Sequence, residues 1–257
     1  IFIHNSKLIK FFNQYTFKLG MINHSGKLRN TLHKAFNIFI THAGYERFIS
    51  QYPENESTNI VIPHGFEQSS LVPIIKKNEV LKVISAGRFV SKKSFYDLIK
   101  AAAQLQRDNF PIQIEIFGSG PLEAELREKI NDLTLKNIQL IGWSENLYDE
   151  FKKADVFCIP SQEEPFGLII GEAMMSGLPV ITTKTDGALE IFGAEPEKRG
   201  AIYVDFSSPD QIKNAIQEIS IDEKRHLLAK NAQENINTNF SLEKLSRKLK
   251  DLFENAD

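Results

Sequence analysis

From Val80 onward, short apolar runs alternate with longer amphipathic stretches. The apolar runs predict strands, and the stretches between them have the spacing of helices. The strands are expected at 80–86, 112–117, 137–141, 155–160, 179–183 and 201–205. The helices are expected near 95–108, 121–134, 145–153, 167–176, 186–193 and 209–219. Strands that alternate with helices favour an α/β fold, with a parallel sheet covered on both faces.

The first sixty residues carry a second and less regular set of elements. The pattern predicts a strand at Ile1–Ile3 and a helix at about Ser6–Leu19. After a polar turn and another helix, a strand is expected at Phe36–Ile40. A helix at Ala43–Ser50 and a short strand at Ile60–Ile62 follow. This region therefore predicts part of a second sheet.

Turn residues divide the chain into segments. The elements at 1–64 end at the break Pro63-His64-Gly65, and a loose polar stretch at 65–78 is predicted to be a linker. The regular pattern fills 79–238. The tail is predicted to be helical with a break at Phe240-Ser241, so that 239–257 forms a last helix that packs back toward the first region.

Composition indicates a soluble globular protein with an uneven charge. The 257 residues are 42% hydrophobic and 25% charged, and no apolar run approaches the roughly 18–20 residues of a membrane span. The single cysteine, Cys158, lies in an apolar run and fits a reducing compartment. Residues 1–50 hold seven Lys or Arg and one acid, whereas the formal net charge of the chain is -2. This basic region either faces anions such as phospholipid headgroups or is an ordinary solvated surface.

Chemistry-bearing residues follow the predicted strands. Right-handed crossovers bring every strand-to-helix loop to one edge of a parallel sheet, where ligands of open α/β sheets bind. The cations, glycines and aromatic residue expected at this edge are Arg88, Lys93, Gly118, Gly120, Gly142 and Trp143. Each also has an ordinary explanation, as a surface charge, a tight turn or a packed side chain. Together they predict a site for a ligand with a phosphate, hydroxyl groups and a flat ring.

The stretch PSQEEPFGLIIGEAMMSGLPV follows the fourth of these strands and is more specific. Gly167 precedes an apolar helix, so backbone amides at the helix N-terminus can approach an anion or a sugar. Helical side chains tilt toward the N-terminus, so Glu172 and Glu164 can face one cavity. Two carboxylates suit hydrogen bonds to vicinal diols, which is sugar and ribose chemistry. A metal site would need further His or Asp residues, and none cluster nearby.

Several motifs resemble one enzyme family as a set. The stretch EPFGLIIGE is similar to the E-x7-E motif of the retaining family 4 glycosyltransferases, which have the GT-B fold. GRFVSKK resembles their phosphate loop, and VIPHGF, FGSGP, LIGW, ADVFCIPS and GLPVITTKTDGALEI follow in matching order. The resemblance covers about 60–240. It implies that the regular region is the C-terminal Rossmann-like domain of such an enzyme, preceded by part of a second Rossmann-like domain.

The resemblance implies a role for each matching residue. Arg88 and Lys93 would grip the diphosphate of a nucleotide sugar, and Glu172 would bind the ribose hydroxyls. Glu164 and the amides of Phe166, Gly167 and Leu168 would contact the transferred sugar. The glycines Gly118 and Gly120, together with Gly142 and Trp143, would border the base. Cations at the diphosphate stabilise the charge that develops as the glycosidic bond breaks. No metal and no cofactor are expected, because enzymes of this fold work without a bound metal.

Some positions depart from the family pattern. Ser94 stands where the family usually has Gly after the lysine, which puts the geometry of the phosphate loop in question. Only about sixty residues precede the linker, where the family has a complete acceptor domain. His4, at the end of a predicted strand, is similar in position to the family's functional histidine, and the alternative is an ordinary polar residue.

The resemblance implies a metal-independent hexosyltransferase that retains anomeric configuration. It would move a sugar from a UDP- or GDP-linked donor to a saccharide or lipid-linked acceptor in lipopolysaccharide or other cell-envelope glycan synthesis. The expected location is cytoplasmic, with peripheral contact at an anionic inner membrane face left open, and no nucleic-acid partner is expected. Two alternatives remain: a non-catalytic sugar-nucleotide-binding module, and a GT-B epimerase or hydrolase of sugar nucleotides.

Overall fold

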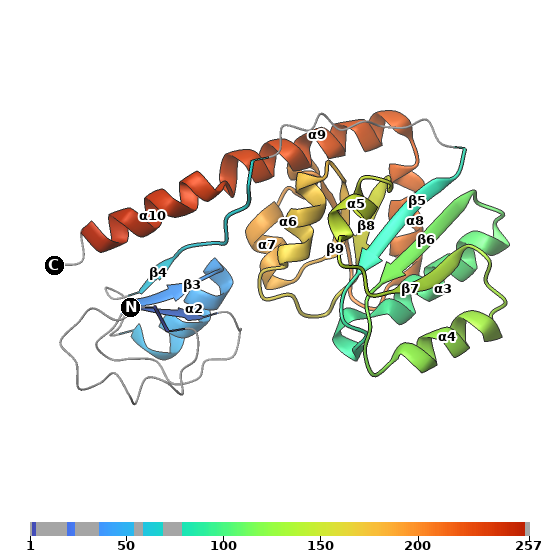
Figure 1. Cartoon of the computed structure of the whole chain (residues 1–257), viewed down its shortest axis with the longest axis horizontal. Helices are drawn as coiled ribbons and strands as arrows, with labels where there is room; N and C mark the ends of the chain where they lie inside the picture. Colours follow the sequence, from blue (N-terminus) through green and yellow to red (C-terminus); the bar gives the residue numbers. More distant parts are fainter. Residues whose placement is uncertain (1, 4–19, 24–35, 54–58, 69–78, 255–257) are drawn as a thin grey trace. The chain divides into compact units, whose positions relative to one another are not determined.

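The computed structural model describes residues 2–3, 20–23, 36–53, 59–68 and 79–254 of the chain (Figure 1). The chain divides into two compact units. One unit comprises Ile1–Gly65 together with Leu242–Asp257, and the other comprises Phe66–Ser241. The chain therefore passes between the two units twice.

The larger unit is built on a six-stranded parallel sheet with the strand order β10-β9-β8-β5-β6-β7. The strand β5 (Leu81–Ala86) pairs with β6 (Ile112–Phe117) on one side and with β8 (Val156–Ile159) on the other. The other strands are β7 (Ile138–Gly142), β9 (Val180–Thr183) and β10 (Ala201–Val204). The predicted strands and the predicted α/β fold are confirmed.

Helices connect these strands at the predicted places. They are α3 (Phe95–Arg107), α4 (Glu123–Asp132), α5 (Leu147–Phe151), α6 (Leu168–Met175), α7 (Asp186–Phe192) and α8 (Pro209–Ile219). Short 3₁₀ turns precede α3 at Ser91–Lys93 and β10 at Pro196–Arg199. Polar side chains cap some of these helices, since Thr185 Oγ1 accepts a hydrogen bond from the Ala188 amide at the start of α7.

The sheet is buried on both faces. On β8, Val156 and Cys158 belong to a core cluster that also contains side chains of α3, α4 and α8. Successive strand residues point to opposite faces, so Phe157 and Ile159, which are also fully buried, face the other layer, where α6 packs on β8 and β9. Burial raises the pKa of the Cys158 thiol to about 12, because the thiolate would lose its hydration. Cys158 is thus buried in the core, as its place in an apolar run of the sequence predicts.

The strand order creates a switch point at β5. From β5 the chain moves outward through β6 and β7, then returns to β8 on the other side of β5 and moves outward to β10. The loops that follow β5 and β8 therefore run in opposite directions from neighbouring strands, which opens a crevice at their carboxyl ends. The first loop carries Arg88 and Lys93, and the second carries Glu164.

The smaller unit holds a four-stranded parallel sheet in the order β1-β2-β3-β4. Three strands and one helix occur where they are predicted, namely β1 (Phe2–Ile3), β3 (Phe36–Phe39), β4 (Asn59–Val61) and α2 (His42–Gln51). The strand β2 (Gly20–Asn23) was not predicted. It pairs with β1 and β3, with Gly20 opposite both Phe2 and Phe36. The predicted helix at Ser6–Leu19 and the helix after it lie outside the described residues.

Two helices end the described chain. They are α9 (Asp222–Asn239), in the larger unit, and α10 (Leu242–Glu254), in the smaller one, so the predicted break at Phe240-Ser241 is confirmed. Phe66, at the start of the stretch predicted as a linker, is buried and forms a parallel β-bridge with Ser241. None of the helices in the described part of the chain is long and apolar enough to cross a membrane.

Candidate functional site

A cavity of about 750 Å³ opens at the carboxyl edge of the larger unit's sheet. The loops after β5, β6 and β7 and the helices α5 and α6 line it. The lining residues are Ala86, Gly87, Arg88, Phe117, Gly118, Ser119, Gly120, Trp143, Ser144, Glu145, Asn146, Leu147, Tyr148, Ile169 and Glu172. The cavity thus lies where the sheet topology predicts a ligand.

Glycines allow two loops to meet in the cavity wall. A Cβ atom on Gly118 would lie 2.0 Å from the carbonyl oxygen of Gly87, and one on Gly120 would lie 2.6 Å from that of Phe89. Gly118 also has a φ of 137°, which is unfavourable for a residue with a side chain. Backbone hydrogen bonds hold this contact, from Phe89 N–H to the Ser119 oxygen at 2.8 Å and from Gly87 N–H to the Phe117 oxygen at 3.0 Å. The GSGP stretch is therefore a site of close loop packing as well as a turn.

Arg88 and Glu172 place opposite charges on the cavity. Both side chains are exposed, and neither makes a hydrogen bond or an ion pair through its charged group with any residue that the structure describes. Partial burial nevertheless raises the pKa of the Glu172 carboxyl group, because the surrounding protein removes part of its hydration. An unpaired cation and an unpaired carboxylate at one cavity can take an anion and a hydroxyl-bearing group of the same ligand.

Lys93 and Glu164 do not line this cavity but pair with each other beside it. The Lys93 ammonium group contacts Glu164 Oε1, and their side chains are only 14% and 8% exposed. Lys93 also lies against the cavity wall, since a Cβ on Gly87 would lie 3.3 Å from Lys93 Cε. The structure therefore brings the four predicted charged residues to neighbouring positions as two sets. One set, Arg88 and Glu172, faces the cavity, and the other, Lys93 and Glu164, is paired next to it.

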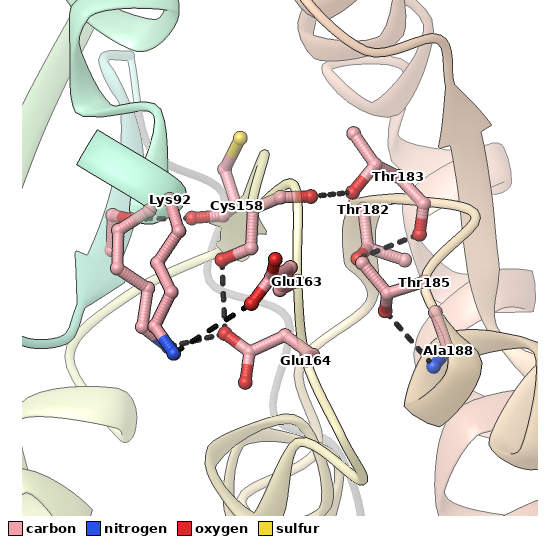
Figure 2. A network of polar contacts seen from close by, with 11 residues as sticks. Lys92, Cys158, Glu163, Glu164, Thr182, Thr183, Thr185 and Ala188 are labelled. Atoms are coloured by element: carbon pink, nitrogen blue, oxygen red, sulfur yellow. Dashed lines mark hydrogen bonds and ion pairs between the residues drawn. The ribbon is translucent and has the colours of Figure 1, made fainter. Parts of the chain in front are cut away.

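A buried polar network holds Glu164 in place (Figure 2). Ser161 Oγ donates a hydrogen bond to Glu164 Oε1 at 2.9 Å, and Thr183 Oγ1 donates to the backbone oxygen of Ser161. The Gly187 amide donates to the backbone oxygen of Glu164 at 2.9 Å. A Cβ on Gly187 would lie 2.0 Å from the Phe166 oxygen, so glycine at this position lets the start of α7 pack closely against the loop that carries Glu164. Glu164 thus has little freedom to move.

The loop after Glu164 leads into the N-terminus of α6. Gly167 precedes this helix with a φ of 82°, the left-handed conformation that glycine adopts easily. Leu168 is 48% exposed, whereas Phe166 is only 2% exposed and points into the protein. The Phe166 side chain is therefore structural. The role of the Phe166, Gly167 and Leu168 amides as contacts for a sugar stays a prediction.

Ser94 has the backbone conformation expected of glycine. Its φ of 51° lies in the left-handed region, and it ends the 3₁₀ turn of Ser91–Lys93 just before α3. The serine therefore accepts a backbone conformation that costs about 1–2 kcal/mol for a residue with a side chain. The loop that presents Lys93 is thus formed with serine at this position.

The remaining predicted site residues occupy different positions. Trp143 lines the cavity and is 78% exposed, so it is available to a ligand and is not part of the core. Gly142, with a φ of 102°, ends β7 next to it and is not among the lining residues. His4 lies outside the described residues. Within the described ranges, no three His, Cys, Asp or Glu side chains form a group that could hold a metal ion.

Of the cavity wall formed by the loop after β7 and by α5, the sequence predicted only Trp143 as a site residue. Ser144, Glu145, Leu147 and Tyr148 line the cavity from the loop after β7 and the first turn of α5. Asn146, which also lines the cavity, begins α5 by accepting a hydrogen bond from the Asp149 amide at 3.3 Å. An Asn followed by an acid three residues later is a helix-start signal. Because this turn follows a predicted strand of the parallel sheet, its residues could have been counted with Trp143 at the ligand edge.

Comparison with known proteins identifies the family. Residues 70–235 match the family described as "Glycosyl transferases group 1". The lipopolysaccharide core biosynthesis glycosyltransferase LpsD of Rhizobium meliloti is 28% identical over 174 residues, which are 67% of this chain and 49% of the relative. The UDP-Gal:alpha-D-GlcNAc-diphosphoundecaprenol alpha-1,3-galactosyltransferase of Escherichia coli is 27% identical over 208 residues, which are 75% of this chain and 53% of the relative. The chain therefore spans about half the length of these curated relatives.

Solved structures share the fold at low sequence identity. Anabaena HepE, solved in complex with UDP-glucose, superposes with a TM-score of 0.81 at 20% identity, covering 99% of this chain and 78% of that one. TarM of S. aureus, solved with UDP, fondaparinux and alpha-GlcNAc-glycerol, gives a TM-score of 0.78 at 18% identity, covering 97% of this chain and 54% of that one. These neighbours have the GT-B fold, and the predicted resemblance is confirmed at that level. Membership of the retaining family 4 stays a prediction.

The family match covers most of the larger unit, which carries the cavity and the motifs of the predicted sheet edge. This chain belongs to the group 1 glycosyl transferases.

Proposed function

We propose that this chain is the donor-binding part of a glycosyltransferase that moves a sugar from a nucleotide sugar to a saccharide or lipid-linked acceptor. The observation that carries the proposal is the cavity at the switch point, where Arg88 and Glu172 are both free of partners among the described residues. A diphosphate needs a cation, and a ribose diol needs a carboxylate. HepE and TarM, which share the fold, were solved with UDP-glucose and with UDP, and this supports a uridine donor.

The ligand can be arranged along the cavity by chemistry. The diphosphate lies at Arg88, with Lys93 next to it, and the ribose lies at Glu172. The base reaches the wall that contains Trp143, and the sugar extends toward Glu164 and the N-terminus of α6. As the glycosidic bond breaks, negative charge grows on the diphosphate, and the two cations stabilise it more in the transition state than in the ground state.

We further propose the finer assignments. Transfer retains the anomeric configuration, the moved sugar is a hexose, and no metal takes part. The acceptor belongs to lipopolysaccharide or another envelope glycan, which is supported by the names of relatives such as LpsD and the putative colanic acid biosynthesis glycosyltransferase WcaL of Escherichia coli. A cytoplasmic location and contact with an anionic membrane surface complete the proposal.

A second candidate follows from chain length. Because the chain spans about half of its curated relatives, it also fits a non-catalytic module that binds a sugar nucleotide and does not transfer the sugar. Transfer of labelled sugar from UDP-glucose or UDP-galactose to an acceptor glycan, measured with this chain and with a chain extended at its N-terminus, separates the two candidates. Binding without transfer by either chain supports the module.

Removing either charged cavity residue should weaken nucleotide binding. We expect Arg88→Ala and Glu172→Ala each to weaken the binding of UDP or GDP by about 1–3 kcal/mol, the range for a lost charge-assisted hydrogen bond. Isothermal titration calorimetry with UDP, GDP, ADP and CDP measures this. Lys100→Ala, a mostly exposed residue on α3, is the matched control and should leave affinity unchanged. Unchanged affinity in both cavity variants contradicts the proposed site.

The raised pKa of Glu172 predicts a pH dependence of binding. Only the carboxylate form of Glu172 can accept hydrogen bonds from both ribose hydroxyl groups. Because its pKa is raised, the carboxylate becomes protonated at a higher pH than an ordinary glutamate does as the solution is acidified. We therefore expect nucleotide affinity to fall on acidification within that window, and Glu172→Gln to lose this dependence. Binding titrations of the unaltered protein and of Glu172→Gln at several pH values test this. Protonation of the nucleotide phosphate affects both proteins equally, so a difference between their pH profiles reports on Glu172. Identical pH profiles contradict the role of Glu172.

A further inference from the structure

Two aromatic side chains from distant parts of the chain hold the loop that carries Glu164. The ring of Phe66 stacks on that of Phe166, with centroids 6.3 Å apart and planes at 19°. Phe240 meets Phe166 edge-on, with centroids 6.1 Å apart. All three side chains are buried. Phe166 lies between Glu164 and Gly167, so these contacts act on the loop that we assign to the sugar.

Phe66 and Phe240 also hold each other. The Phe66 amide donates a hydrogen bond to the Phe240 oxygen at 2.7 Å, and Phe66 forms a parallel β-bridge with Ser241. The helix α6 makes room for the ring of Phe66 at Gly171, where a Cβ would lie only 2.1 Å from the ring carbon Cζ. The three rings therefore form a closely fitted cluster, which we call the Phe66–Phe166–Phe240 cluster.

The cluster lies where the chain leaves the larger unit. The division between the units falls at Gly65 and Phe66, and again at Ser241 and Leu242. The segments that enter and leave the unit therefore meet each other and Phe166. The cluster touches the Glu164 loop through Phe166 and α6 through Gly171, and none of its three rings lines the cavity that holds Arg88 and Glu172.

We propose that Phe66 and Phe240 are positioning residues for the donor sugar. They fix Phe166, so that the Glu164 carboxylate and the amides of Gly167 and Leu168 keep the geometry that the sugar requires. Sites of this kind need placement within about 0.5 Å, which the supporting residues must supply. The proposal rests on the proposed function, because that function makes the Glu164 loop the sugar contact. The two parts of the donor should therefore respond differently. Loss of the cluster should weaken binding of the sugar but leave binding of the nucleotide unchanged.

The substitution Phe66→Leu tests this in the full chain. We expect it to weaken the binding of UDP-glucose or GDP-mannose about tenfold, whichever the unaltered protein binds, and to change the affinity for UDP or GDP less than about twofold. We also expect faster hydrogen exchange, without any ligand, at the amides of Gly187 and Ile170, which donate hydrogen bonds to the Glu164 and Gly167 oxygens of this loop. The exchange measurement does not depend on which nucleotide binds.

A second variant and a control make the test specific. Gly171→Ala should displace the Phe66 ring and reproduce both effects, although alanine favours the helix by about 1 kcal/mol. Phe110→Leu, which removes an aromatic ring packed against the core just before β6, should produce neither effect.

The outcomes are distinguishable. If the unaltered protein binds no nucleotide, the proposed function fails, and the sugar role of the cluster fails with it. If it binds nucleotide sugars but Phe66→Leu weakens UDP and UDP-glucose equally, only the positioning role is overturned. Unchanged hydrogen exchange at the Gly187 and Ile170 amides in both variants also overturns it.

Discussion

Replacing Gly118 by alanine should severely weaken both folding and nucleotide binding. The added Cβ would lie 2.0 Å from the Gly87 oxygen, a backbone atom that cannot move without displacing the loop after β5. The φ of 137° at Gly118 adds conformational strain. We expect Gly118→Ala to lower the free energy of unfolding by about 3–5 kcal/mol, the sum of overpacking and strain. Urea unfolding followed by circular dichroism measures this. Calorimetry with UDP should show a parallel loss, because Gly87 and Gly118 both line the cavity.

Gly142→Ala separates strain from overpacking. Gly142 also has a positive φ, 102°, but a Cβ there meets nothing within 4 Å. The variant should therefore cost only the strain, about 1–2 kcal/mol, and should retain nucleotide binding. Equal losses of stability in the two variants would show that the close approach of Gly118 to Gly87 is not what requires glycine.

Removing one member of the Lys93–Glu164 pair should destabilise the protein more than removing both. The two side chains are 14% and 8% exposed, so a single substitution leaves a charge in a mostly buried place. We expect Lys93→Met and Glu164→Leu each to lower the free energy of unfolding by about 3 kcal/mol, and the double variant to lower it by less than either single variant. Urea unfolding of the four proteins in this cycle measures the coupling.

The neighbouring pair provides the matched control. Lys92 and Glu163 are adjacent in sequence to the buried pair, but their side chains are 51% and 68% exposed and their charged atoms are 3.9 Å apart. Lys92→Met and Glu163→Leu should each change the free energy of unfolding by less than about 0.5 kcal/mol. If the losses of unfolding free energy for Lys93→Met and Glu164→Leu were additive in the double variant, the ion pair would not be what compensates the cost of burying these two charges.

The Lys93–Glu164 pair also bears on how a donor binds. Oε1 of Glu164 accepts hydrogen bonds from Lys93 and Ser161, so the Lys93 ammonium group proposed to bind the diphosphate is already paired with Glu164. A diphosphate that approaches Lys93 therefore competes with Glu164 for its ammonium group. When the diphosphate binds Lys93, the Glu164 carboxylate, which we propose holds the sugar, loses part of its ion pair and becomes available to accept hydrogen bonds from the sugar.

Most of the larger unit's architecture could be predicted from the sequence. Strands buried on both faces, such as Val156–Ile159, are continuous apolar runs, and the helices between them have amphipathic spacing. The short strand Gly20–Asn23 could not be predicted, because its sequence GMIN has a weak strand pattern and only its pairing with β1 and β3 defines it. A run of apolar residues identifies a strand that is buried on both faces of the sheet. A short strand without such a run is defined only by its hydrogen bonds to the neighbouring strands.

The candidate site divides in the same way. The sequence by itself determined that Arg88, Lys93, Glu164 and Glu172 follow parallel strands or begin a helix, because the handedness of crossovers places such residues at one edge. Only the tertiary structure decided that Arg88 and Glu172 face the cavity while Lys93 and Glu164 pair beside it. Only it brought Phe66 and Phe240 onto Phe166. Contacts between residues far apart in the chain depend on how whole elements pack, and spacing along the sequence carries no record of that packing.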